Sequence, residues 1–239
     1  MASPAGVHRT MIGDMTALEQ LLADVDAAFV VTGDGLEPWP DPNPERSPDA
    51  AAYSRVTAPE RYRLIVARAR AWVEGLVAGG IASATAVDRI EWAQEPDGFP
   101  PVSSRVRLDA ARPGTVPLFV IETGFAGLTD NAVEIAFGDP SIRWEYIIDC
   151  GCDACDSGSA DLLAVLDEAI IDVVSGALRY RWSGHRSLRL GVDGASMRGE
   201  ILSRRRERAA TAAGAEAWRA EILAATEAWA EIGGASWLD

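Results

Sequence analysis

Apolar residues recur at intervals of three and four positions in four segments of the chain, which is the spacing of one face of an α-helix. These segments are residues 15–33, 57–79, 159–176 and 218–232. The second segment begins with Thr57-Ala-Pro-Glu60, whose two ends can form a capping box. The pattern therefore predicts three or four helices.

Shorter segments alternate apolar and polar residues or are apolar throughout, as β-strands are. They are residues 87–92, 116–121, 132–137, 144–148, 178–182 and 188–192. The last two predict a meander that closes the sheet and continues into a type I′ turn at Asp193-Gly194. Pro117 is expected at the start of its strand or in a bulge, because proline donates no ladder hydrogen bond. Residues 94–115 have no clear period, which indicates a long surface loop.

Together these elements predict the α+β class. We expect a single domain over residues 14–239, with a mainly antiparallel sheet of five to seven strands packed with three or four helices. Residues 1–13 lack periodicity and predict a flexible tail. Alternate prolines over residues 37–45 fix the backbone angle φ and predict a rigid, extended segment on the surface.

Charge narrows the range of partners. The formal net charge of −14 opposes binding to phosphate backbones and to acidic membranes, so we expect neither nucleic acid nor membrane as a partner. The basic run at residues 204–208 has glutamates at helical spacing, which favours ion pairs on a solvated helix. No apolar run approaches the ~20 residues of a bilayer span, and the N-terminus has no signal-peptide order. We expect a cytoplasmic protein whose partner is another protein or a small ligand.

Lysine is absent from the chain and histidine is scarce, and both residues support many kinds of catalysis. All 22 basic residues are arginine, so Schiff-base chemistry, a Walker A lysine and a Ser-Lys dyad are excluded. The two histidines are His8 and His185, so an HExxH metalloprotease motif is excluded as well. His8 falls in the expected tail, which leaves His185 as the candidate for any histidine-dependent chemistry.

The three cysteines of the chain, Cys150, Cys152 and Cys155, lie within six residues. Thiolates bind Zn²⁺ in tetrahedral sites, so this loop predicts a metal site, with zinc as the candidate ion. A tetrahedral site needs a fourth ligand. Asp149 or His185 could supply it, and so could water or the other loop aspartates, Asp153 and Asp156.

Two other interpretations of the loop stay open. Cys152 and Cys155 form a CxxC before a helix N-terminus, whose dipole would lower a thiol pKa and favour redox chemistry, although the neighbouring aspartates oppose this. Alternatively, the thiols are simply packed in a loop whose Asp156, Ser157 and Ser159 cap the next helix.

The sequence Asp-Cys-Gly-Cys-Asp-Ala-Cys-Asp-Ser-Gly-Ser at residues 149–159 resembles the signature of an actinobacterial family, domain of unknown function 6226. Other matching segments are Trp39-Pro-Asp-Pro-Asn-Pro-Glu-Arg46, Tyr53-Ser-Arg-Val-Thr-Ala-Pro-Glu-Arg-Tyr62, the Val116-Pro-Leu segment, Gly138-Asp-Pro140 and Gly234-Ala-Ser-Trp237. The resemblance implies a single-domain bacterial protein and carries no assigned activity.

No hydrolase, kinase, dinucleotide or metalloprotease motif accompanies the cysteine cluster. The sequence therefore favours a non-catalytic binding or structural domain whose cysteine loop holds a metal. The alternative is a thiol-dependent redox enzyme that uses Cys152 or Cys155, with Arg55 or His185 in contact with an anion.

Overall fold

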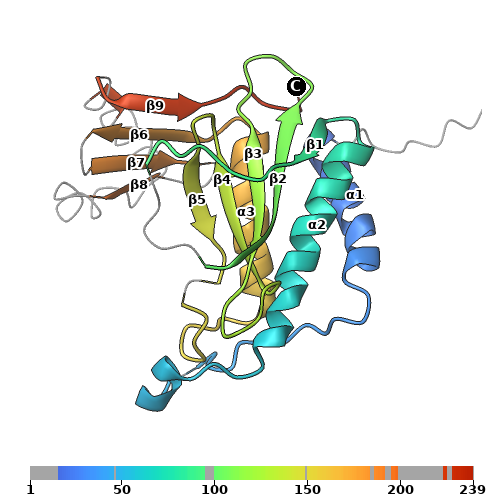
Figure 1. Cartoon of the computed structure of the whole chain (residues 1–239), viewed down its shortest axis with the longest axis vertical. Coiled ribbons are helices and arrows are strands. Elements are labelled where there is room, and N and C mark those ends of the chain that lie inside the picture. Colours follow the sequence, from blue (N-terminus) through green and yellow to red (C-terminus); the bar gives the residue numbers. More distant parts are fainter. Residues whose placement is uncertain are drawn as a thin grey trace, which may run out of the picture.

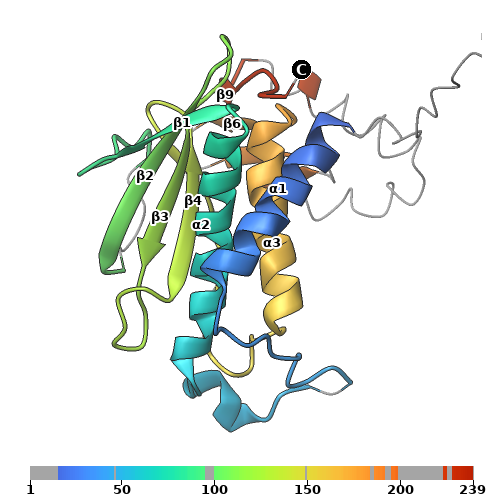
Figure 2. The same ribbon diagram turned by 90° about the vertical axis from the view of Figure 1, so that its right-hand side faces the viewer.

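The computed structural model describes residues 16–45, 47–94, 100–148, 150–183, 186–191, 195–198, 223–224 and 228–238. Within these ranges three helices cover one face of a five-stranded antiparallel sheet (Figures 1 and 2). The helices are α1 (Ala17–Thr32), α2 (Arg63–Ala78) and α3 (Ser159–Val174), with short 3-10 turns η1 (Ala50–Ser54) and η2 (Pro59–Tyr62). The strands, in spatial order, are β1 (Ala82–Ala86), β2 (Val102–Ala110), β3 (Leu118–Thr123), β4 (Ala132–Phe137) and β5 (Ile142–Tyr146). The predicted α+β class is confirmed.

The predicted meander forms, but it belongs to a second sheet beside the first, so the expectation that it closes the first sheet is wrong. Its strands are β6 (Arg179–Ser183), β7 (Arg186–Leu190), β8 (Ala195–Arg198) and β9 (Ala230–Gly233), in the order β8-β7-β6-β9. β9 lies where the sequence predicts the end of a helix, so that prediction is wrong for residues 230–232. The backbone there pairs with β6, and Glu231 forms ion pairs with Arg179 and Arg181.

The core between the helices and the first sheet follows the predicted helix stripes. In the predicted helical segment 57–79, the apolar residues at intervals of three and four are all buried. They are Tyr62, Ile65, Ala69, Trp72 and Leu76. They pack with Leu166 and Ile170 of α3 and with Leu108, Ile135 and Phe137 of the sheet. Burying each such side chain contributes about 1.5–3 kcal/mol, so this layer is the main source of stability.

The helix starts differ from the predictions in two of three cases. Thr16 and Glu19 form a full capping box at α1. The predicted box at Thr57 and Glu60 is wrong, because Thr57 bonds to Asp153 instead and α2 begins at Arg63. The expected side-chain caps of α3 are also wrong: Gly158 occupies the N-cap without a side-chain hydrogen bond.

Two predictions about the first sheet are wrong. The expected loop over residues 94–115 contains β2, a nine-residue strand whose residues 105–110 alternate polar and apolar side chains as a strand does. The expected strand at 87–92 is an irregular segment after β1, which joins the sheet through a single bridge from Trp92 to Ser141. Pro117 precedes β3, as predicted.

Several predicted positions lie outside the described residues. They are the 1–13 tail with His8, Asp149, His185, the Asp193-Gly194 turn, the 204–208 run and the 218–222 part of the last predicted helix. Among the helices that the structure does describe, none is long and apolar enough to cross a bilayer.

Candidate metal centre

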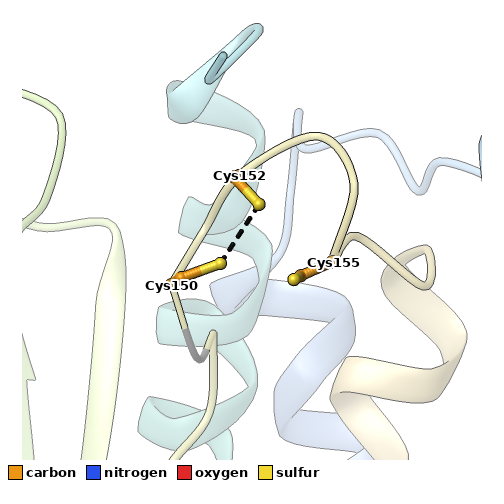
Figure 3. Close-up of side chains that lie close together, drawn as sticks. All are labelled: Cys150, Cys152 and Cys155. Carbon is orange, nitrogen blue, oxygen red and sulfur yellow. Dashed lines mark hydrogen bonds between the residues drawn. The ribbon is translucent and has the colours of Figure 1, made fainter. Parts of the chain in front are cut away.

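The three cysteines converge in the loop between β5 and α3. Their Sγ atoms all lie within 4.8 Å of one another, and the Cys150 thiol donates to the sulfur of Cys152 at 3.1 Å. Figure 3 shows Cys155 pointing toward this pair from the other side of the loop. Cys152 is buried, whereas Cys150 and Cys155 are exposed, so an ion from solvent can reach the cluster.

Tight backbone turns bring the sulfurs together. Gly151 has a φ of +68°, the left-handed region that glycine adopts without strain, and its N–H donates to the Ile148 carbonyl at 2.9 Å. The Cys155 N–H donates to the Cys152 carbonyl at 3.0 Å. A Cβ on residue 151 would lie 2.4 Å from the Phe125 ring, so the glycine also permits close packing.

Asp153 ties the loop to the chain between α1 and η2, residues 33–58, called the connecting strap below. Its carboxylate accepts from Arg55 Nε at 2.6 Å, from the Thr57 N–H at 2.7 Å and from the Thr57 hydroxyl at 2.8 Å. The Asp153 N–H donates in turn to the Arg55 carbonyl at 2.8 Å. Burial raises the pKa of Asp153, but the bonds from Arg55 and Thr57 prevail, so its pKa lies below the usual range.

Asp156 makes a second, deeper attachment. Its carboxylate is fully buried and accepts from the Trp39 indole N–H at 3.0 and 3.1 Å, from the Gly158 N–H at 2.9 Å and from the Arg61 guanidinium. Arg61 also stacks over the rings of Trp39 and Tyr62, each 5.2 Å away. The loop is therefore held by charged and aromatic groups from both the strap and η2.

The sulfurs differ in their affinity for protons. The pKa of Cys152 is lowered, chiefly because the Cys150 thiol donates to its sulfur, and also because backbone N–H groups of residues 154 and 155 stabilise the thiolate. The pKa of Cys155 is raised to about 12 by the neighbouring sulfurs of Cys150 and Cys152. Of these two thiols, Cys152 therefore gives up its proton more readily than Cys155.

The other predicted site residues have varied outcomes. Asp149 and His185 lie outside the described residues. Asp153 and Asp156 serve as anchors. Arg55 reaches the loop but is engaged by Asp153.

The redox interpretation depends on Cys152 and Cys155, whereas the 3.1 Å hydrogen bond between sulfur atoms joins Cys150 to Cys152. All three cysteines are free thiols. The sequence did not reveal Trp39, Thr57 and Arg61 as supporting residues, since nothing local relates them to the loop. The tryptophan within the proline-rich segment was the one available signal.

The geometry suits a thiophilic ion. A tetrahedral zinc about 2.3 Å from each sulfur places the sulfurs about 3.8 Å apart. The sulfurs of Cys150 and Cys152 are 3.1 Å apart, and no two of the three sulfurs are more than 4.8 Å apart. These distances are close to the separation that a tetrahedral zinc requires. The three cysteines are therefore able to hold a metal ion after small side-chain movements.

Comparison with known proteins gives one match. The model of a family of unknown function, DUF6226, matches residues 25–237, which include the second half of α1, the connecting strap, α2, the cysteine loop and α3. A search of the curated proteins and a search of the solved structures each found no match.

Proposed function

This chain belongs to the DUF6226 family, and we propose that it is a non-catalytic binding domain whose Cys150, Cys152 and Cys155 hold a structural zinc ion. The observation that carries the proposal is the convergence of three sulfurs in a loop anchored on both sides. Negative charge on several of these sulfurs at once is costly without a cation, and the pKa of Cys155 is accordingly raised to about 12 beside the sulfurs of Cys150 and Cys152.

Zinc is the ion that best suits the donor set. Thiolates are soft ligands and favour zinc over the hard ions magnesium and calcium. Zinc also accepts the tetrahedral arrangement that three sulfurs and one further ligand provide. Asp149, next to Cys150 in the chain, or a water molecule would complete the set.

The role we propose for the ion is mechanical. A metal on the loop would fix Asp153 and Asp156 in place, and through them the connecting strap and η2. Structural zinc contributes directly to folding free energy, because the unfolded chain has no preformed site. The domain would then act on a protein or small-ligand partner through its other surfaces.

Elemental analysis of protein purified without an affinity tag tests the proposal. We expect about one equivalent of zinc, with loss of the ion in Cys152→Ser. Ser157→Ala, a change in the same loop that removes no thiol, is the matched control and should retain the metal. Less than about a tenth of an equivalent in the wild-type protein, with none taken up from added zinc, would reject the metal.

The rate at which the cysteines of the same purified protein are alkylated tests the alternative, a redox enzyme. The lowered pKa of Cys152 favours that alternative. A thiolate used in catalysis should alkylate rapidly at neutral pH and form a reversible disulfide with a neighbouring cysteine. Metal-free protein that alkylates at the slow rate of an ordinary thiol would exclude this function.

A further inference from the structure

The sheet face opposite the helices has a small apolar cluster of its own. Phe119, Ile121 and Ala136 are buried there, although none of the helices in the described part of the chain covers them. The irregular segment after β1, residues 87–93, crosses this face and is called the arch below (Figure 1). Its ends are fixed by backbone hydrogen bonds, from the Val87 N–H to Arg105 at 3.0 Å and between Glu91 and Ser141 at 2.7 Å.

A pocket of about 190 Å³ lies between the arch and the sheet. The arch contributes Arg89, Ile90 and Trp92, and the strands contribute Val102, Arg105, Ile121 and Glu134. Its volume corresponds to about six water molecules, and drug-sized ligands occupy about 300–1,000 Å³. The pocket thus suits a small metabolite and excludes a dinucleotide.

The pocket carries cations that its surroundings leave available. Within the described parts of the chain, Arg89 has neither an ion pair nor a hydrogen bond, and Arg105 makes one hydrogen bond, to the Asp88 carbonyl at 3.1 Å. Guanidinium groups bind carboxylates in a bidentate manner. Two such groups at one pocket stand out in a chain with a net charge of −14.

The pocket's carboxylate does not cancel this positive charge. Glu134 is 1% exposed, and its carboxylate already accepts from Arg143 Nε at 2.7 Å. Burial raises the pKa of Glu134, and the charges of Arg143 and, to a smaller extent, of Arg105 oppose that effect. Because Glu134 and Arg143 together are close to neutral, Arg89 and Arg105 remain as excess positive charge.

We propose that this pocket binds a small organic carboxylate. The carboxylate lies between Arg89 and Arg105, and the apolar part of the ligand packs against Trp92, Ile90 and Ile121. Charge attraction alone would also admit inorganic anions, but the apolar lining favours a ligand that combines both features. The proposal shares no residue with the cysteine loop, so it stands or falls independently of the metal.

Benzoate is a suitable probe, with benzamide as its uncharged counterpart of the same shape. Titration followed by ¹H–¹⁵N NMR reports on the Trp92 indole N–H, whose signal is assigned from a Trp92→Phe variant. We expect benzoate to saturate that shift below about 10 mM, and benzamide to bind at least about tenfold more weakly. Acetate and inorganic phosphate, which lack the apolar group, should also bind at least about tenfold more weakly.

Two variants should weaken benzoate binding about tenfold or more, Arg89→Met and Arg105→Met. Arg112→Met makes the same substitution at an exposed arginine outside the pocket and should leave binding unchanged. Equal binding of benzoate and benzamide would overturn the proposal. So would the absence of a saturable shift in the wild-type protein, or equal affinity in all three folded variants.

Discussion

Replacing Gly151 with alanine tests whether the cysteine loop depends on a close backbone approach. Gly151 and Gly80 share a φ of +68°, so alanine meets the same backbone strain at both positions, about 1–2 kcal/mol. Their surroundings differ. A Cβ at residue 80 would have no neighbour within 4 Å, whereas one at residue 151 would lie 2.4, 2.9 and 3.0 Å from three atoms of the Phe125 ring.

Carbon atoms normally approach to about 3.5–4.0 Å, so the Phe125 ring must move by about 1 Å in Gly151→Ala. That ring packs edge-on against Tyr62, with centroids 5.3 Å apart, and Tyr62 packs similarly against Trp39. Overpacking of this kind costs about 1–3 kcal/mol beyond the backbone strain. We expect Gly151→Ala to lose about 2–5 kcal/mol and Gly80→Ala about 1–2 kcal/mol.

Urea denaturation followed by circular dichroism measures both losses. Phe125→Leu should recover part of the cost of Gly151→Ala, because the smaller side chain leaves room for the new methyl group. The reasoning fails if the two glycine variants lose the same free energy, or if Phe125→Leu adds its full cost to that of Gly151→Ala.

Two further predictions concern charged groups. Asp156→Ala should cost about 3–5 kcal/mol, because it leaves the Arg61 guanidinium without its buried partner. Asp161→Asn, at an exposed position in the same region, should cost about 0.5 kcal/mol. Free energies of unfolding from urea denaturation that differ between the two variants by less than about 1 kcal/mol would contradict this. The pKa of Glu19 is lowered by hydrogen bonds from the Thr16 backbone and side chain, so its stabilising effect is present above the ordinary carboxyl pKa and is lost as the pH falls through the lowered value. When the pH is lowered from about 5 to about 3, the Glu19→Gln variant should therefore lose less stability than the wild-type protein does. Urea midpoints of both proteins at the two pH values measure this difference.

Local pattern was enough to predict the three helices, because their buried stripes repeat within a few turns. The prediction was wrong at β2, although Arg105, Arg107 and Asp109 alternate there with apolar positions as in a strand. Arg107 is accommodated by an ion pair with Asp109, two residues along the strand, and by two distant partners, the Phe119 ring and Asp139, which only the folded sheet brings near. The prediction was wrong at β9 as well, because the three-residue spacing of Trp229 and Ile232 favours a helix, whereas pairing with the distant strand β6 makes residues 230–233 a strand.

The candidate site divides in the same way. Cysteine spacing alone located the cluster, because the three sulfurs lie within six residues. The groups that hold it could not be predicted, since Trp39, Arg61 and Thr57 reach the loop only after the chain has folded. Asp156 and Thr57 each have a plausible local capping role, and in both cases a distant hydrogen bond replaces it.

The distance along the chain between the cysteine loop and its anchors has a kinetic consequence. The bonds from Asp153 and Asp156 to Thr57, Arg61 and Trp39 span 95 to 117 positions. Contacts of such high contact order form only after much loop-closure entropy has been lost, so the anchored loop should be among the last parts of the chain to take shape. A short peptide containing the three cysteines would consequently not reproduce the thiol chemistry of the folded protein. The rate at which the thiols become protected from alkylation would report the final stage of refolding.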